Sequence, residues 1–220
     1  IGLYGVDSKT IFDPFVGSGT TMVEASLHSN FVEAYGVDIN PLALLIAKVK
    51  TTKIDLNALE EEYLKLLNRI RLNKTKKFDK PDFGNIDFWF KPTVINDLNA
   101  IKNCIGQIGD ANIRDFFLVA FSQTVRRVSN TRNGEFKLYR IEESELKKFG
   151  PNTIKEFKET VDYYFEKLKE YLPQKTNCNV LLFNDDTRKL ISIPKNHVDL
   201  LVTSPPYGDS KTTVAYGQFS

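Results

Sequence analysis

The chain has few of the residues that build metal sites, redox centres or disulfide frameworks. Its 220 residues include two cysteines, Cys104 and Cys178, and two histidines, His28 and His197. The cysteines form no Cys-x-x-Cys pair, and two isolated histidines cannot complete a zinc-ligand set. The sequence therefore predicts no metal site and a reduced, intracellular protein located in the cytoplasm.

Long apolar runs and a strong excess of one charge are also missing. No run approaches the about 20 residues of a membrane-spanning helix, and no signal peptide is recognisable, so we expect no membrane association. The formal net charge of +2 does not by itself indicate a nucleic-acid partner. With 41% hydrophobic and 26% charged residues, the composition is that of an ordinary globular protein.

The first fifty residues alternate between strand and helix patterns. Residues 9–15 and 32–40 read as strands, each followed by a helical pattern at 20–29 and 41–50. Asn40 is a typical N-cap residue and Pro41 suits the first helical position. A strand–helix–strand–helix order favours a parallel sheet.

A longer helical region follows, and strand patterns return near the end. Apolar residues at helical spacing begin at Leu56, and further helices are expected at 93–108, 111–128 and 152–172, with "DFWF" (Asp87–Phe90) filling the core. Strands are expected at 179–186 and 197–204. We therefore predict an α/β fold in three regions: a sheet half at 1–54, a mainly helical insert at 55–176, and a continuation of the sheet at 177–220.

A glycine turn, "DPFVGSGTT" (Asp13–Thr21), joins the first strand to the first helix. Met22 stands where a dinucleotide fingerprint needs glycine, and no Gly-Lys-Ser/Thr phosphate loop is present. Asp38 ends the next strand about 20 residues on, where a carboxylate can accept ribose hydroxyls. Asp13 suits an ammonium group. A ligand with a ribose and an amino acid, but no phosphate, is S-adenosylmethionine.

Four stretches resemble motifs of the amino-methylating DNA methyltransferases, the N4-cytosine and N6-adenine type: "DPFVGSGTT", "GVDIN", "FNDDTRKL" and "TSPPY". The resemblance implies that S-adenosylmethionine is the cofactor. Asp186 best fits the position that holds the adenine amino group, with Asp185 as the second choice. The cofactor-binding residues implied are Asp13, Pro14, Phe15, Gly17, Ser18, Gly19, Thr20, Asp38, Ile39, Asp185 and Asp186.

The "TSPPY" stretch follows the apolar run "VDLLV" and resembles the catalytic motif of the same family, which implies catalytic roles for Ser204, Pro205, Pro206 and Tyr207. The Ser204 hydroxyl and the Pro205 carbonyl would accept the amine hydrogens, and Tyr207 would stack on a flipped base. Serine in first position favours cytosine N4, with adenine N6 second. An RNA base methyltransferase and a non-catalytic nucleic-acid-binding fragment are the alternatives.

The stretch "VRRVSNTRNGEFKLYR" mixes basic and aromatic residues, which suits phosphate contacts and base stacking. A solvated helix end and loop is the alternative interpretation. The partner expected is double-stranded DNA, with a cognate restriction endonuclease as a further partner. The nucleic-acid-binding residues predicted are Arg126, Arg127, Arg132, Lys137 and Arg140.

By the same resemblance, the four predicted strands would lie in the order 3-2-1-4, as the cofactor half of a seven-stranded sheet. The chain begins at Ile1 and thirteen residues follow Tyr207, so we expect a fragment with an incomplete sheet. The last strand would then be an exposed apolar edge that favours self-association. We expect the isolated chain to bind cofactor weakly and to require the missing half for methylation.

Overall fold

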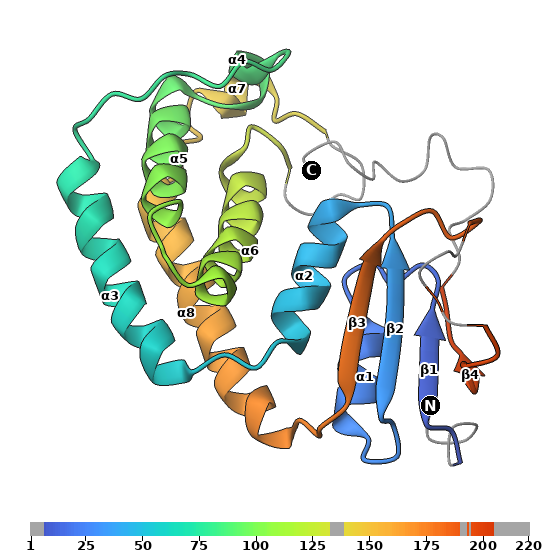
Figure 1. Cartoon of the computed structure of the whole chain (residues 1–220). Coiled ribbons are helices and arrows are strands. Elements are labelled where there is room, and N and C mark those ends of the chain that lie inside the picture. Colours follow the sequence, from blue (N-terminus) through green and yellow to red (C-terminus); the bar gives the residue numbers. More distant parts are fainter. Residues whose placement is uncertain (1–6, 133–138, 190–192, 194, 205–220) are drawn as a thin grey trace.

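The computed structural model describes residues 7–132, 139–189, 193 and 195–204, and its centre is a parallel sheet. Four strands lie in the order β3-β2-β1-β4, and each pairs in parallel with its neighbours (Figure 1). This confirms the predicted α/β, Rossmann-like fold and the predicted strand order. The strands are β1 (Thr10–Asp13), β2 (Glu33–Asp38), β3 (Asn179–Asn184) and β4 (Leu200–Leu201).

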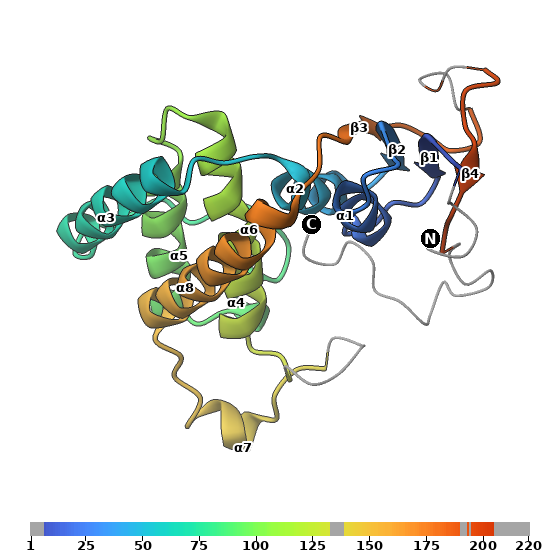
Figure 2. The ribbon, with the colours of Figure 1, turned by 90° about the horizontal axis from the view of Figure 1, so that it is seen from below.

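Both faces of the sheet are covered, by different parts of the chain. Helices α1 (Thr20–Leu27) and α2 (Pro41–Thr51) lie on one face (Figure 2), where Ile11, Met22 and Ala34 are completely buried. On the other face, Phe12, Tyr35 and Val37 form a second buried cluster. The segment after β3 contributes Val198 to this cluster. Side chains therefore alternate between two apolar layers along β1, β2 and β3.

The remaining helices form a separate packed layer beside the sheet (Figure 1). Its core contains the completely buried side chains of Leu59, Leu66, Phe117, Phe157 and Val161. The elements between β2 and β3 that follow α2 are α3 (Leu56–Asn73), α4 (Ile86–Trp89), α5 (Pro92–Ile105), α6 (Ala111–Val128), α7 (Glu143–Leu146), α8 (Thr153–Tyr171) and the 3₁₀ turn η1 (Leu172–Gln174).

Four helices, including α2, begin at a residue whose side chain caps the first turn. Asn40, Asp55, Asp110 and Asn152 each accept hydrogen bonds from backbone amides in the first turn of α2, α3, α6 and α8. Such caps satisfy amides that have no partner inside the helix, and each contributes about 1 kcal/mol. The cap and Pro41 predicted for α2 are both confirmed.

The expectation that "DFWF" fills the core is wrong for part of the stretch. Phe90 is buried, but Phe88 is 46% exposed, and the Arg140 guanidinium lies over its ring, 4.3 Å from the centroid. Within the four-residue helix α4, Ile86 is buried and Trp89 is half-buried, and the buried Phe90 follows at its C-cap. The sequence pattern did not indicate this helix, because four residues are too few to show a period.

The chain leaves the sheet after α2 and returns to it, after the helical layer, at a nearby point. After α8, the Thr176 amide donates to the Ser26 carbonyl of α1 at 2.8 Å, and the Lys175 ammonium donates to the Thr51 carbonyl at the end of α2. The Asn179 amide then donates to the Val32 carbonyl at 2.8 Å and starts β3. The chain thus rejoins the sheet beside the end of the helix from which it departed.

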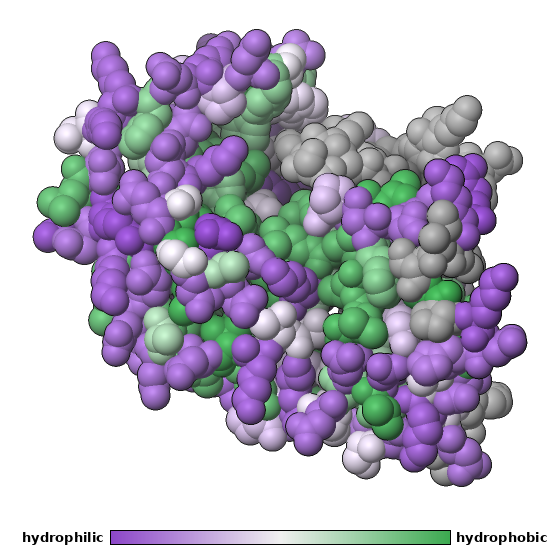
Figure 3. Space-filling view, in the orientation of Figure 1, coloured by the Kyte–Doolittle hydropathy of each residue, from purple (hydrophilic) through white to green (hydrophobic). Residues whose placement is uncertain are grey.

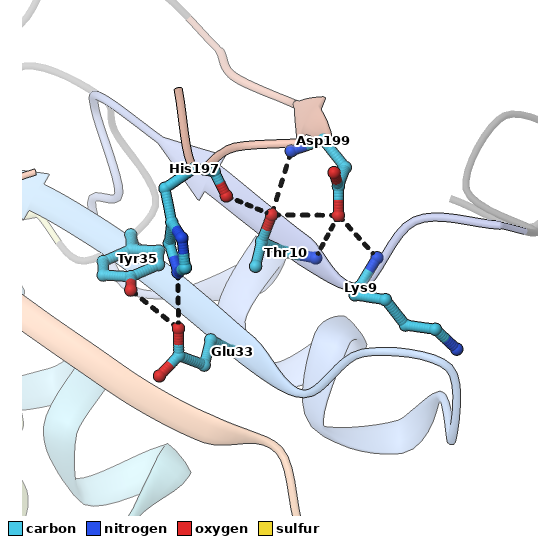
Figure 4. Close-up of polar contacts among 6 residues, drawn as sticks. All are labelled: Lys9, Thr10, Glu33, Tyr35, His197 and Asp199. Atoms are coloured by element: carbon cyan, nitrogen blue, oxygen red, sulfur yellow. Dashed lines mark hydrogen bonds and ion pairs between the residues drawn. The ribbon is translucent and has the colours of Figure 1, made fainter. Parts of the chain in front are cut away.

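A polar network fixes the short strand β4 to β1 (Figure 4). Asp199 Oδ2 accepts the backbone amides of Lys9 and Thr10 at 2.8 and 2.9 Å. The Thr10 hydroxyl donates to the His197 carbonyl at 2.5 Å and accepts from the Asp199 amide at 2.9 Å. Because β4 forms only two register pairs with β1, these side-chain contacts supply much of its attachment.

A second part of the network lies on the same face of the sheet (Figure 4). The Tyr35 hydroxyl donates to Glu33 Oε2 at 2.7 Å, and His197 Nε2 lies 2.9 Å from the same oxygen. The hydrogen bond with His197, and then that from Tyr35, hold the pKa of Glu33 below its ordinary value. Burial, and then the Glu33 carboxylate, raise the pKa of Tyr35.

Figure 3 shows hydrophilic side chains over the outer helices and hydrophobic ones gathered between the helical layer and the sheet. None of the helices in the described part of the chain combines the length and apolarity that a membrane crossing requires. Within the described part, no three His, Cys, Asp or Glu side chains are grouped so that they could hold a metal ion.

Candidate cofactor-binding and catalytic site

The glycine turn lies at the carboxyl end of β1 and is locked to β2. Gly17 and Gly19 both have positive φ, +50° and +84°, a region that side chains with a Cβ rarely adopt. The Val16 amide donates to the Val37 carbonyl at 2.9 Å, and the Gly17 amide donates to Asp38 Oδ2 at 2.9 Å. The carboxyl ends of two neighbouring strands are therefore joined through this turn.

Asp13 is 4% exposed and stabilises the turn from inside. Its Oδ1 accepts the Phe15 amide at 3.1 Å, and its Oδ2 accepts the Thr21 hydroxyl at 2.6 Å. The carboxylate thus joins the end of β1 to the first turn of α1. Each oxygen retains acceptor capacity, so the role proposed for Asp13 towards an ammonium group stays a prediction.

Asp38 ends β2 with its carboxylate placed between the glycine turn and α2. Oδ2 accepts from the Gly17 amide, and Oδ1 accepts from the Asn40 amide at 2.9 Å. These two bonds fix the direction of the carboxylate. An ionised carboxylate has about four acceptor positions, so Asp38 can still accept two hydroxyl groups of a ribose.

The two glycines have different surroundings. A Cβ added to Gly19 would lie 2.7 Å from the Cβ of Ala47, so this glycine permits α1 to pack against α2. A Cβ added to Gly17 would approach only the Phe15 carbonyl, at 3.9 Å. The space beside Gly17 is therefore open to a ligand, as a cofactor site requires.

Apolar and polar side chains in and beside the turn are exposed. Phe15 is 39% and Ile39 is 73% exposed, although both are apolar, and they flank the turn and Asp38. Pro14 is buried, whereas Ser18 and Thr20 are exposed. The described part of the site thus offers a carboxylate, backbone groups and two apolar surfaces, which fit the ribose and the adenine of S-adenosylmethionine.

The loop after β3 is tied to the same edge of the sheet. The Asn184 side-chain amide lies 3.3 Å from the carbonyls of both Asp38 and Ile39, and the Thr187 hydroxyl donates to the Pro14 carbonyl. The sequence interpretation missed both residues, together with Thr21 and Lys50. The Lys50 ammonium donates to the Ser18 carbonyl at 2.9 Å, and burial lowers its pKa.

Asp186 is held by Arg188 in the described structure. The guanidinium donates to Asp186 Oδ2 at 2.6 Å and to Oδ1 at 3.0 Å, and the Arg188 amide donates to Oδ1. The Arg188 side chain, and then its backbone amide, lower the pKa of Asp186 to about 2. Asp185 Oδ1 accepts from the Asp186 amide at 2.7 Å. A role for either acid in binding adenine stays a prediction.

Strand β4 lies beside β1 and leads to Ser204, the first residue of the predicted catalytic motif. Its residues pair with β1 through Ile11–Leu200 and Phe12–Leu201, and the Val202 amide donates to the Phe12 carbonyl at 3.0 Å. The chain therefore leaves β4 beside the strand that ends at Asp13. Ser204 is exposed there. Pro205, Pro206 and Tyr207 lie outside the described residues.

The predicted nucleic-acid-binding arginines lie at the end of α6 and in the segment that follows it, and most of them have partners. Arg132 donates to Glu142 at 2.8 Å, and Arg140 pairs with Glu143. Arg127 lies 3.9 Å from the carboxylate of Glu156 and donates to Thr160 at 3.3 Å. Arg126 is exposed, and its side chain forms no hydrogen bond or ion pair with other described residues. Lys137 lies outside the described residues.

Comparison with known proteins relates the chain to type II methyltransferases. It is 44% identical over 230 aligned residues to the type II methyltransferase M.MvaI of Kocuria varians, an alignment that covers 96% of this chain and 49% of that protein. It is 41% identical over 78 residues to the type II methyltransferase M.MjaII of Methanocaldococcus jannaschii, covering 36% of this chain and 13% of that protein.

The chain therefore spans about half the length of M.MvaI and a smaller part of M.MjaII. No family model matches the chain, and no solved structure matches it.

Proposed function

We propose that this chain carries the cofactor-binding and catalytic residues of a DNA methyltransferase that uses S-adenosylmethionine to methylate an exocyclic amine. Its similarity to type II methyltransferases along 96% of its length supports the reaction class. The observation that carries the proposal is the pairing of Gly17 with Asp38: a 2.9 Å bond fixes the carboxylate next to open space.

In the proposed complex, Asp38 accepts the ribose hydroxyls, while Phe15 and Ile39 contact the adenine ring. Asp186, or Asp185 in its place, accepts the adenine amino group. Asp13, Pro14, Ser18, Gly19 and Thr20 form the rest of the turn around the cofactor. The cofactor, when bound, supplies an electrophilic methyl group on its sulfonium.

The chain's own part in the chemistry is to prepare the target amine. The lone pair of the cytosine amino group is delocalised into the ring, which makes that nitrogen a weak nucleophile. Two acceptors on its hydrogens, the Ser204 hydroxyl and the Pro205 carbonyl, would localise the pair and orient it. The protein would position the base and stabilise the developing charge, and the reaction would need no covalent intermediate between protein and base. Tyr207 would stack on the flipped base.

Cytosine N4 is the preferred target because serine stands first in the Ser204–Tyr207 motif. Adenine N6 is equally compatible with the described geometry and forms the alternative. We propose double-stranded DNA as the substrate and the cytoplasm as the place of action. A cognate restriction endonuclease, and self-association through the β4 edge, where Leu201 is 57% exposed, remain predictions.

Isothermal titration with S-adenosylmethionine tests cofactor binding. The unchanged chain should bind, and Asp38→Ala should weaken binding by at least tenfold, because two ribose hydroxyls lose their acceptor. Ser204→Ala, which keeps the turn intact, serves as the matched control and should bind like the unchanged chain. Equal affinities for the unchanged chain and Asp38→Ala would reject the assigned site.

Analysis of the modified base tests the reaction. DNA from cells that express the active protein is digested to nucleosides, and N4-methylcytosine is expected. N6-methyladenine would select the alternative target, and methylated RNA bases without methylated DNA bases would reject a DNA substrate.

A further inference from the structure

A polar hollow lies at one end of the helical layer, outside the site described above. It is formed by the carboxyl-terminal end of α6, the amino-terminal end of α8 and the loop of residues 147–152 that precedes α8. Its volume is about 760 Å³. Gln123, Arg126, Arg127, Lys148 and Glu156 contribute its charged and amide groups, and we call it the α6–α8 hollow.

The charges in the hollow are unbalanced. Arg126, Arg127 and Lys148 are cationic, whereas Glu156 is the one carboxylate among the residues that line it. The Arg126 side chain forms no ion pair or hydrogen bond within the described residues. The nearest carboxylate to the Lys148 ammonium is that of Glu145, at 3.8 Å, and both side chains are largely exposed. A pair of this kind contributes little, so it competes weakly with an anionic ligand.

Arg127 is held in place rather than extended into solvent. Its guanidinium donates to Thr160 Oγ1 at 3.3 Å and lies 3.9 Å from the Glu156 carboxylate, both on α8. These contacts fix the direction of the side chain, which remains 43% exposed. A guanidinium with a fixed direction loses less conformational entropy when it binds an oxyanion.

The loop that closes the hollow is also anchored. The Lys91 ammonium donates to the Phe149 carbonyl, and the Phe149 amide donates to the Glu145 carbonyl at 2.9 Å. At the end of the loop, Asn152 caps α8 by accepting the Lys155 amide at 3.1 Å. The backbone that carries Lys148 is therefore held in place where it lines the hollow.

The neighbouring basic residues offer no comparable site. Arg132 and Arg140 form closer ion pairs, with Glu142 at 2.8 Å and with Glu143, than Lys148 forms with Glu145 at 3.8 Å. The end of α6 that holds Arg126 and the carboxyl ends of β1–β3 face the same end of the molecule (Figure 1). A duplex that presents a base to the carboxyl edge of the sheet would therefore pass the same end of the helical layer.

We propose that the α6–α8 hollow binds backbone phosphates of duplex DNA through Arg126, Arg127 and Lys148, with the Gln123 amide as a neutral donor. The inference rests on the proposed function, which makes DNA the substrate. Phosphate contacts of this kind position a protein on the duplex and carry no sequence information. The hollow is thus a positioning site, separate from the groups that hold the cofactor.

Fluorescence anisotropy with a labelled DNA duplex, measured over a range of salt concentrations, tests the proposal. Arg126→Ala and Lys148→Ala should each weaken binding about tenfold at low salt. Each should also reduce the slope of log affinity against log salt concentration by about one unit. Lys65→Ala on α3 is the matched control, because it removes one exposed lysine elsewhere, and it should bind DNA like the unchanged chain.

Titration of the same variants with S-adenosylmethionine separates the two proposals. Weakened DNA binding by the two variants, with unchanged affinity for S-adenosylmethionine, supports the hollow as a DNA-binding site. If the unchanged chain did not bind S-adenosylmethionine, that result would count against the proposed function instead. Salt slopes of Arg126→Ala and Lys148→Ala equal to that of Lys65→Ala would overturn the assignment. So would an unchanged chain that does not bind duplex DNA at low salt, or that binds duplex RNA of the same sequence more tightly.

Discussion

The Thr21 hydroxyl donates to the Asp13 carboxylate at 2.6 Å, joining the first turn of α1 to the end of β1. Because Asp13 is 4% exposed, loss of this donor leaves a buried carboxylate oxygen short of a partner. We predict that Thr21→Val lowers the free energy of unfolding by about 1–3 kcal/mol. Thr21→Ser, which keeps the hydroxyl, should retain most of the stability. Urea unfolding measures both, and a Thr21→Val protein as stable as Thr21→Ser would contradict the role of the bond.

Gly17 and Gly19 should respond differently to alanine. At Gly19 the new methyl group meets Ala47 at 2.7 Å, and φ is +84°, so we expect a loss of about 2–5 kcal/mol in the free energy of unfolding. At Gly17, where the space is open, we expect only the backbone cost of about 1–2 kcal/mol.

Gly17→Ala, the less destabilising of the two variants, should be the one that directly weakens cofactor binding. The methyl group of Gly17→Ala projects into the proposed ligand space, so binding of S-adenosylmethionine should fall although the protein remains folded. Unfolding and titration experiments on both variants check this. Full affinity in Gly17→Ala would mean that the open space is not the cofactor site.

Ser204 should affect turnover rather than cofactor binding. In a preparation that methylates DNA, Ser204→Ala should lower the rate of methyl transfer by about a hundredfold, because the hydroxyl meets the amine in the transition state. The affinity for S-adenosylmethionine should stay the same. Single-turnover kinetics and titration measure the two effects, and an unchanged rate would remove Ser204 from the reaction.

The Asp199 contacts predict a pH-dependent attachment of β4. The Lys9 amide, and then the Thr10 amide, hold the pKa of Asp199 below its ordinary value of about 3.9. A carboxylate whose pKa is lowered on folding stabilises the fold above the unfolded pKa, and this contribution is lost as the pH falls through the folded pKa. Asp199→Asn removes the charge, so its deficit relative to the unchanged chain should be complete near pH 6 and shrink below about pH 4.

Thermal unfolding of both proteins over this pH range provides the measurement. Thr10→Val, which removes a partner but keeps the carboxylate, should remain less stable than the unchanged chain near pH 6. A deficit of Asp199→Asn that stays constant from pH 6 to pH 3 would show that the carboxylate does not carry the attachment.

The strand order and the main helices could be predicted because their signals are local or come from a resemblance. Short apolar runs, one leading into the glycine turn and one ending in an acid, located β1 and β2, and the Asn40–Pro41 pair located the start of α2. The helix expected at 111–128 is α6, with the same bounds. A longer strand was expected at 197–204 than the two residues of β4. The length was wrong because an apolar run does not reveal how many of its residues pair with a neighbouring strand.

The contacts of the candidate site could be predicted only in part. Asp13, Gly17 and Asp38 were identified from their places next to strands, and the structure brings them together. The roles of Thr21, Asn184 and Thr187 depend on contacts between distant segments, for which a single sequence gives no signal. The ion pairs of Arg132 and Arg140 with Glu142 and Glu143 were likewise missed, because basic residues were counted without the acids that follow them.

Thr176 is bonded to Ser26, and Lys175 to Thr51, so the helical stretch begins and ends at neighbouring points of the sheet domain. This arrangement affects how the sequence of that stretch can vary. The register between β2 and β3 is set by six residue pairs of their own, and the cost of closing a longer or shorter connection changes slowly with its length. We therefore expect that the stretch between residues 52 and 175 can be replaced by another helical segment without loss of the sheet. To pack on the sheet domain, a replacement must keep the surface that faces α2, where Lys48 pairs with Asp115 at 2.7 Å.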